Sequence, residues 1–290
     1  MLNPPLSLLS DYLLASIVEQ LAEFSCLEDL KNLSLADRTF TQSCQKYIFR
    51  ELNLGSGWKI PQQLTRVRKF LEDKPSFANL VREIVLGVPK TYEELQSIML
   101  FKDPNFTSIL QLFAKSRMPP HRLLFLGGLR RPFTIEDSLL VTRQLAESFF
   151  SQTLTVLRLI DIRNVPLPLF LICPKLRVVE LDQVGATDKS YNAYPDNQCS
   201  GREAPLLEVL EYRNSHTLVE QMIAPPPRFN TPVVLWSNLR VLTLAPDDKE
   251  GMASLQPILD AACNTLQELY LNSMCVGDGR CGVFNNMKQI

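Results

Sequence analysis

Two histidines and one glycine-rich run are the parts of this 290-residue chain whose residue types could perform chemistry. Gly277-Asp-Gly-Arg-Cys-Gly282 matches the Gly-x-Gly-x-x-Gly pattern with which dinucleotide-binding folds approach a pyrophosphate. The residues up to Ile290 are too few for the pyrophosphate-binding helix and for an acidic residue about twenty positions further on, so we interpret the run as a turn. His121 and His216 belong to no His-x-x-x-His or Cys/His cluster, and no Gly-x-Ser-x-Gly elbow or phosphate-binding loop is present. The sequence predicts no catalytic residue, no metal site, no cofactor and no enzymatic activity.

Charge and cysteine content narrow the possible partners. The net charge is -1, so no overall positive field would draw the chain onto nucleic acid or an anionic membrane, and we expect neither as a partner. The basic run from Lys115 to Arg131 is interrupted by apolar residues; we interpret it as a solvated edge, with a phosphate-binding patch as the alternative. The seven cysteines contain no Cys-x-x-Cys pair, and no signal-peptide or transmembrane pattern is found. These features are typical of a reducing compartment and predict a cytoplasmic or nuclear protein.

The first fifty residues have the apolar spacing of three short helices, the first of which Ser10 can cap. The apolar positions that recur three or four residues apart are Leu13, Ile17 and Leu21, then Leu27, Leu30 and Leu33, then Phe40, Cys44 and Tyr47. Three such helices bury little surface by themselves. Gly55-Ser56-Gly57 then breaks the pattern, so we expect a helical module at residues 1–54 and a second domain at residues 55–290.

The second domain repeats one short pattern six times: an apolar residue, two others, an apolar residue, one other and an apolar residue. The copies start at Val81, Leu154, Leu176, Leu207, Leu239 and Leu266. From Leu154 onward the starts lie 22, 31, 32 and 27 residues apart, and helices are expected around residues 64–71, 93–101, 108–113 and 138–149. One strand-containing unit cannot bury its own apolar face, so neighbouring units must stack. The sequence therefore predicts an α/β solenoid with a curved, mainly parallel sheet.

The residues between the inward leucines should line the opposite face of the sheet, because side chains alternate along a strand. The central positions of that face are Val85, Arg158, Glu180, Glu211, Thr243 and Tyr270, and Asp182, Arg213 and Asn272 flank them. Adjacent strands lie about 4.8 Å apart, so Arg158 is expected to pair with Glu180. We expect this face to bind a protein, with Tyr270 as an aromatic anchor. The alternative is a merely solvated face.

The N-terminal helices also resemble a known family. Leu9-Ser-Asp-Tyr-Leu-Leu-Ala-Ser-Ile-Val18, followed by residues 29–40 and 47–52, resembles an F-box, whose pattern begins Leu-Pro-x-Glu-Leu and ends with a leucine-rich helix and Arg-x-Phe. The matching positions are Leu9, Leu13, Ile17, Leu30, Leu33, Leu35, Arg38 and Phe40, whereas Ser10, Tyr12 and Ser16 depart from the pattern. The remainder is similar to the degenerate leucine-rich repeats that follow F-boxes in many fungal proteins. Ile162, Val184 and Ser215 stand where those repeats usually have Asn or Cys.

The resemblance implies a substrate-recognition adaptor of an SCF-type cullin–RING ubiquitin ligase. The residues that would bind a Skp-type adaptor are Leu9, Leu13, Ile17, Leu30, Leu33, Leu35 and Phe40. The residues that would hold an unidentified protein substrate are Arg158, Glu180, Asp182, Glu211, Arg213, Thr243, Tyr270 and Asn272. For the helices the alternative is an ordinary bundle core that packs on the solenoid. For the whole chain it is an interaction scaffold that has lost its coupling to the ligase.

Overall fold

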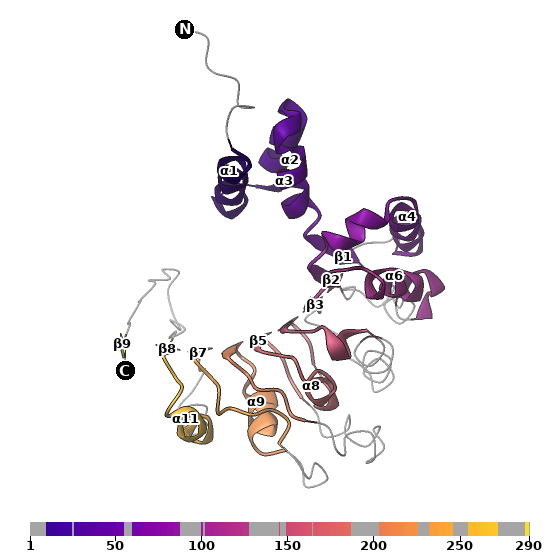
Figure 1. Ribbon diagram of the computed structural model, residues 1–290. Coiled ribbons are helices and arrows are strands. Elements are labelled where there is room, and N and C mark those ends of the chain that lie inside the picture. Colours follow the sequence, from indigo (N-terminus) through magenta and orange to yellow (C-terminus); the bar gives the residue numbers. More distant parts are fainter. Residues whose placement is uncertain are drawn as a thin grey trace, which may run out of the picture.

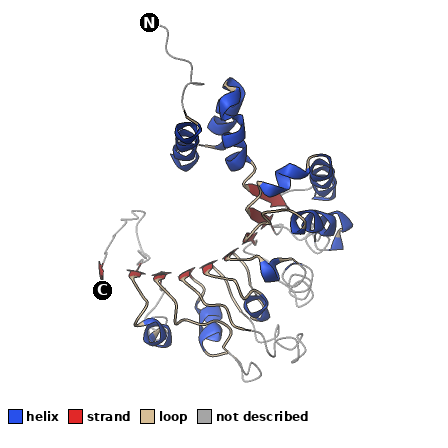
Figure 2. Ribbon diagram, viewed as in Figure 1, coloured by secondary structure: helices blue, strands red, loops and turns tan. Residues whose placement is uncertain are grey.

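The computed structural model describes residues 10–24, 26–54, 60–87, 100, 102–127, 145, 149–163, 165–186, 203–225, 232–245, 255–271 and 288–289. The protein is an α/β fold in which three N-terminal helices precede one open sheet. In Figure 1 the strands follow one another along an arc, with the remaining helices on its outer side and the three N-terminal helices set apart from it. Figure 2 shows the same division between strands and helices.

The N-terminal helices are α1 (Asp11–Phe24), α2 (Leu27–Ala36) and α3 (Arg38–Ile48). At the start of α1, the hydroxyl of Ser10 accepts a hydrogen bond from the Leu13 N–H at 3.4 Å, and Asp37 accepts one from the Thr39 N–H at 2.9 Å at the start of α3. Both contacts supply partners to amide groups that a helix cannot satisfy internally. The three helices enclose a small core of their own, made by Leu14, Val18, Leu30, Phe40 and Cys44.

The sheet has nine strands in the described residues, and their order in space is their order in the chain. They are β1 (Glu51–Leu54), β2 (Glu83–Gly87), β3 (Arg122–Leu126), β4 (Val156–Ile160), β5 (Val178–Asp182), β6 (Val209–Arg213), β7 (Val241–Ala245), β8 (Glu268–Leu271) and β9 (Lys288–Gln289). The first eight pair in parallel, and β9 pairs antiparallel with β8. The connecting helices are α4 (Ile60–Asp73), α6 (Pro104–Ala114), α8 (Pro168–Ile172), α9 (His216–Ile223) and α11 (Gln256–Ala262), with the 3-10 turns η2 (Pro75–Asn79) and η5 (Phe150–Gln152).

One hydrogen-bond arrangement recurs where successive strands begin. The carbonyl of Thr155 accepts the N–H groups of Arg177 and Val178 at 2.9 and 3.0 Å. The carbonyl of Arg177 likewise accepts those of Glu208 and Val209 at 2.8 and 3.1 Å. Because each strand is joined to the previous one in the same way, loops of unequal length still deliver strands in one register. Leu157, Val179, Leu210, Leu242 and Leu269 consequently form a single inward row.

The sequence pattern predicted six of these strands, and each copy lies on a strand: β2 and β4 to β8. The helices expected around residues 64–71 and 108–113 are α4 and α6, whereas the segments 93–101 and 138–149 lie almost wholly outside the described residues. The strands β1 and β3 were not predicted. The third helix ends at Ile48, and the strand β1 that follows it pairs with β2.

A second recurring feature follows the strands. Asp161 directly follows β4, Gln183 follows β5 and Asn214 follows β6. Each of these residues has a positive φ, between 49° and 57°. Gly127 stands at the same place after β3, and its N–H donates to the carbonyl of Ile160 at 2.7 Å. A Cβ added at Gly127 would lie 2.2 Å from the carbonyl oxygen of Asp161. The close approach of the two backbones therefore requires glycine there.

We expect Gly127→Ala to lower the free energy of unfolding by about 1–3 kcal/mol, the usual cost of forcing atoms into a filled space. The added methyl group would meet backbone, which cannot rotate away as a side chain can. Urea unfolding followed by circular dichroism measures the loss. Gly185→Ala is the control, because its Cβ would meet nothing closer than Cγ of Arg163 at 3.9 Å. An equal loss in both variants would contradict the explanation.

Candidate protein-binding surfaces

Exposed apolar side chains concentrate on α1 and α2. Of the nine large hydrophobic side chains that are exposed in the described part of the chain, six lie on these two helices: Tyr12, Leu13, Ile17, Phe24, Leu27 and Leu35. Leu35 is 84% exposed, Leu13 48% and Ile17 40%. Their neighbours Leu14 and Val18 are buried in the small core, so the exposed residues are not needed to close it. An excess of exposed apolar side chains on one small module points to a protein–protein contact.

The residues that were predicted to bind an adaptor fall into two groups in the structure, one buried and one exposed. Leu30 and Phe40 are 3% and 2% exposed and belong to the core of the three helices, because helices this short need a shared interior. Leu33 packs against that core and is partly buried. These three residues therefore support the module from within, and the predicted residues that present an open surface are Leu13, Ile17 and Leu35. Leu9 lies outside the described residues.

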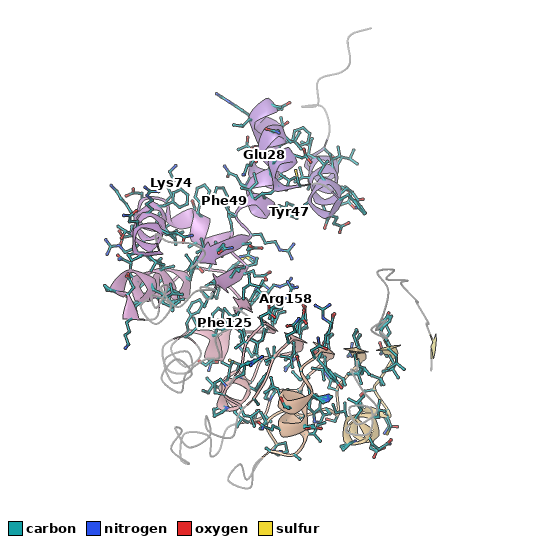
Figure 3. The ribbon with its side chains drawn as sticks, turned by 180° about the vertical axis from the view of Figure 1, so that it is seen from behind. Glu28, Tyr47, Phe49, Lys74, Phe125 and Arg158 are labelled. Carbon is teal, nitrogen blue, oxygen red and sulfur yellow. The ribbon has the colours of Figure 1, made fainter. Side chains whose placement is uncertain are left out.

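The predicted substrate-binding residues form a row on the face of the sheet opposite the inward apolar row. We call this the inner face, because it lies on the inner side of the arc in Figure 1. The register places Arg158, Glu180, Glu211, Thr243 and Tyr270 side by side on β4 to β8. Nε of Arg158 lies 2.5 Å from Oε2 of Glu180, so the expected ion pair across the face is confirmed. Figure 3 shows Arg158 among the side chains that project from this face.

A second ion pair flanks the row: Nε of Arg213 donates to Oδ1 of Asp182 at 2.8 Å. At the far end, the hydroxyl of Tyr270 donates to Oε2 of Glu268 at 2.5 Å, which raises the pKa of Tyr270. This phenol is therefore held by its own strand, with its ring partly exposed. Asn272 lies outside the described residues.

The inner face is closed at β2 and β3 and open from β4 onward. Val85 was predicted to be exposed there, but it is only 1% exposed, and Leu124 beside it is 9% exposed. Glu83, on the same face of β2, is also buried and lies 3.5 Å from Nε of Arg122 and 3.9 Å from Nη1 of Arg158. The alternation of side chains along the strand placed Val85 on the correct face, but the expectation that Val85 is exposed was wrong. This row is therefore buried at β2 and β3 and is open again from Arg158 onward.

Glu211 differs from the other charged residues of the row. It stands directly opposite Glu180 on the neighbouring strand, and no cation lies within ion-pair distance of its carboxylate among the described residues. Glu211 is exposed, but partial desolvation by its neighbours raises its pKa and the charge of Glu180 raises it further, whereas Arg158 and Arg213 lower it. Like charges on directly opposed residues destabilise a sheet. Glu211 is thus a carboxylate without an ion-pair partner of its own among the described residues, and Arg158 and Arg213 offset only part of the repulsion.

Sequence reasoning missed a row of valines beside the charged row. Val156, Val178, Val209 and Val241 are paired across β4 to β7, and all four are partly exposed. The signal was available, since valine directly precedes the middle apolar residue in four of the six pattern copies. The open face therefore combines one apolar row and one charged row.

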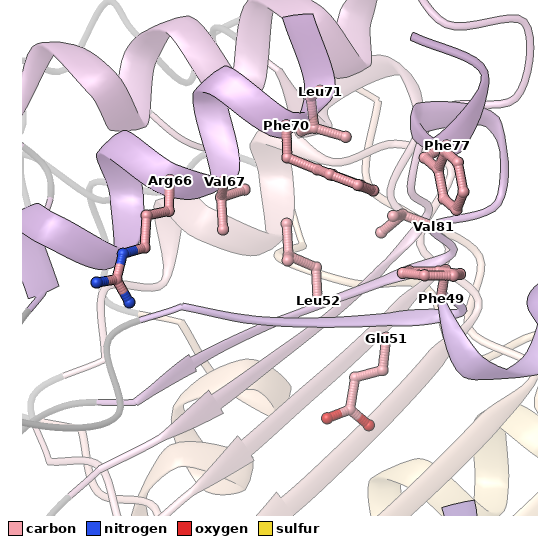
Figure 4. A pocket seen from close by; sticks show the side chains of 9 residues that line it. All are labelled: Phe49, Glu51, Leu52, Arg66, Val67, Phe70, Leu71, Phe77 and Val81. Carbon is pink, nitrogen blue, oxygen red and sulfur yellow. The ribbon is translucent and has the colours of Figure 1, made fainter. Parts of the chain in front are cut away.

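A cavity of about 280 Å³ lies where the three helices join the sheet. Its walls come mainly from Phe49, Phe70 and Phe77, whose rings pack against one another, with centroids 4.6 Å apart for Phe49 and Phe77. Figure 4 shows that the charged ends of Glu51 and Arg66 point away from it. No polar groups converge there, so the cavity has no means to orient a reacting molecule.

The chemistry-bearing residues do not gather into a site in the part of the chain that is described. No group of three His, Cys, Asp or Glu residues in that part could hold a metal ion. His121 lies beside Arg82 and Arg122; burial lowers its pKa, and these cations lower it further. Among the described segments, no helix is both long and apolar enough to cross a membrane. No protein-family model matches the chain, and no curated protein matches it.

Proposed function

We propose that the protein is a substrate-recognition adaptor of an SCF-type cullin–RING ubiquitin ligase. Its N-terminal helices would bind a Skp-type adaptor, and its strand and helix units, a degenerate leucine-rich-repeat solenoid, would hold the substrate protein. Such a receptor accelerates ubiquitin transfer by raising the effective concentration of a substrate lysine and orienting it, without a catalytic group of its own. The free cysteines Cys26, Cys44 and Cys263 fit a cytoplasmic or nuclear location.

The observation that carries the proposal is the set of exposed apolar side chains on α1 and α2. Leu13, Ile17 and Leu35 lie outside a core that is already complete, on a module set apart from the sheet (Figure 1). Leaving such side chains in water costs about 25 cal/mol per Å² of apolar surface, which a partner would recover. An outside subunit accounts for this exposure better than packing on the sheet does.

The solenoid interpretation is supported by three recurring features: the uniform parallel register, the shared hydrogen-bond arrangement before strands and the positive φ after β4, β5 and β6. The place usually taken by Asn or Cys is occupied by buried Ile162, Val184 and Ser215. The hydroxyl of Ser215 accepts the Val184 N–H at 3.0 Å and donates to the Arg213 carbonyl at 2.7 Å. One unit thus satisfies its neighbour's backbone through a side chain, as an asparagine at that place would.

We expect Ile17→Asp to weaken binding of a purified Skp-type adaptor by at least about thirtyfold, the effect of removing an interface hot spot. A carboxylate at the centre of an apolar contact would be buried without a partner. Titration calorimetry with the full chain measures the affinity. Leu206→Asp is the matched control, because Leu206 is 38% exposed, close to the 40% of Ile17, and lies beyond the helices. Equal adaptor binding by wild type and Ile17→Asp would exclude this interface.

A non-ligase scaffold is the second candidate, and Tyr12 favours it. Tyr12 stands where the F-box pattern has Glu, and its ring is 80% exposed, so this contact surface differs from the family pattern in charge and size. If the wild-type chain shows no affinity for a Skp-type adaptor, the scaffold becomes the better interpretation. Tight binding by the wild type would exclude it.

A further inference from the structure

The open inner face has a charge that is left over once its own ion pairs are formed. Arg158 is engaged by Glu180, and Arg213 by Asp182. Both cations are therefore paired with carboxylates other than that of Glu211. Glu211 itself faces Glu180 on one side and the uncharged Thr243 on the other. The row is thus locally negative at Glu211, on the exposed surface of β6. A cation placed above Glu211 would relieve its repulsion with Glu180.

The valine row shows what should accompany that cation. Val209 is two residues from Glu211 on the same strand, and Val178 and Val241 lie beside Val209 on the neighbouring strands. Residues two apart in a strand are about 6.6 Å apart, which is also the separation of residues i and i+2 in an extended peptide. One short extended segment can therefore contact the valine row and Glu211 with successive side chains on the same side.

We propose that this face binds an extended protein segment that places a lysine or arginine on Glu211 and an apolar side chain on the valine row. The inference rests on the proposed function, because it names the chemistry of the substrate that the receptor holds. Charge complementarity selects the basic residue, and the partly exposed valines select its apolar neighbour. An acidic segment would add a third carboxylate beside Glu180 and Glu211 and is excluded by repulsion.

The test uses the full chain as bait for a phage-displayed library of random ten-residue peptides. We expect the selected peptides to share one lysine or arginine with an apolar residue two positions away. The selected peptide should bind Glu211→Gln about fivefold more weakly than wild type, the effect of losing one partly screened charge pair. Glu220→Gln is the matched control, since it removes the same charge from the exposed surface of α9 and should leave binding unchanged.

The pH dependence gives a second readout. Binding of the selected peptide should weaken as pH falls through the raised pKa of Glu211, because the peptide cation persists while the carboxylate is neutralised. The other charged groups that face Glu211 are Glu180, Asp182, Arg158 and Arg213, and all of them remain in Glu211→Gln. The variant should therefore lose the part of the pH dependence that belongs to Glu211.

Selected peptides without a basic preference, unchanged affinity for Glu211→Gln, or a library from which nothing is enriched would each overturn this inference. The same protein preparations are then tested for binding of the Skp-type adaptor. Adaptor binding without basic-peptide selection would reject the inference alone. Basic-peptide selection without adaptor binding would support the inference and reject the ligase role.

Discussion

Phe40→Ala is expected to unfold the three N-terminal helices and leave the sheet folded. Phe40 is 2% exposed, and removing a buried phenylalanine side chain costs about 3–5 kcal/mol. Three short helices with one small core have little stability to lose. In the described residues the core around Phe40 shares no member with the core of the sheet, so the loss should stay local.

Hydrogen exchange followed by mass spectrometry measures this result. Peptides from residues 11–48 should lose their protection in Phe40→Ala, and peptides from β4 to β7 should keep theirs. Leu35→Ala is the control on the same module, because Leu35 is 84% exposed and its truncation should change stability by less than about 0.5 kcal/mol. Loss of protection in the sheet as well would show that the two cores are coupled. The proposed adaptor binding should disappear in Phe40→Ala although Leu13, Ile17 and Leu35 are not substituted.

The strands could be predicted from the sequence because their pattern is local. The two that were missed, β1 and β3, carry the same spacing with a different first residue: Phe49, Leu52 and Leu54 before and along β1, and Pro120, Leu123 and Phe125 at β3. All six predicted copies begin with Val or Leu, whereas phenylalanine and proline take that place before β1 and β3.

Exposure on the helices could not be predicted in the same way. Leu13 and Leu14 are adjacent, as are Ile17 and Val18, yet Leu14 and Val18 are buried whereas Leu13 and Ile17 are exposed. Helical periodicity identifies an apolar stripe more than 100° wide, and all four residues fall within it. Which edge of the stripe faces the other helices depends on how they pack, and that information is not local to the sequence. The burial of Leu30 and Phe40, two of the residues expected to bind an adaptor, could not be predicted for the same reason.

The sequence predicted the exposure of residues on the sheet only in part, and for a different reason. Alternation correctly placed Val85 opposite Ile84 and Leu86, because it depends on the strand alone. Whether a residue on that face reaches solvent depends on what lies above it, and Val85 is buried where Arg158, two strands further on, is open. The sequence therefore specified the two faces of the sheet and the Arg158–Glu180 pair, but not the point at which the inner face opens.

Leu210→Asp should have the opposite effect to Phe40→Ala: the sheet should unfold while the three helices persist. Leu210 is fully buried between Val179 and Leu242 in the inward row, where an aspartate would have to stay unpaired or take up a proton. That cost, several kcal/mol, is a large fraction of the roughly 5–15 kcal/mol by which a typical domain is stable. Because stacked units share one continuous core, the loss should spread along the strands.

Hydrogen exchange should show lost protection throughout β4 to β7 with residues 11–48 still protected. Thr243→Asp, on the open face of β7, is the control and should remain folded. Retained protection in the strands flanking β6 would show that each unit is stable alone, which would remove the physical basis for the proposal that the sheet is one solenoid.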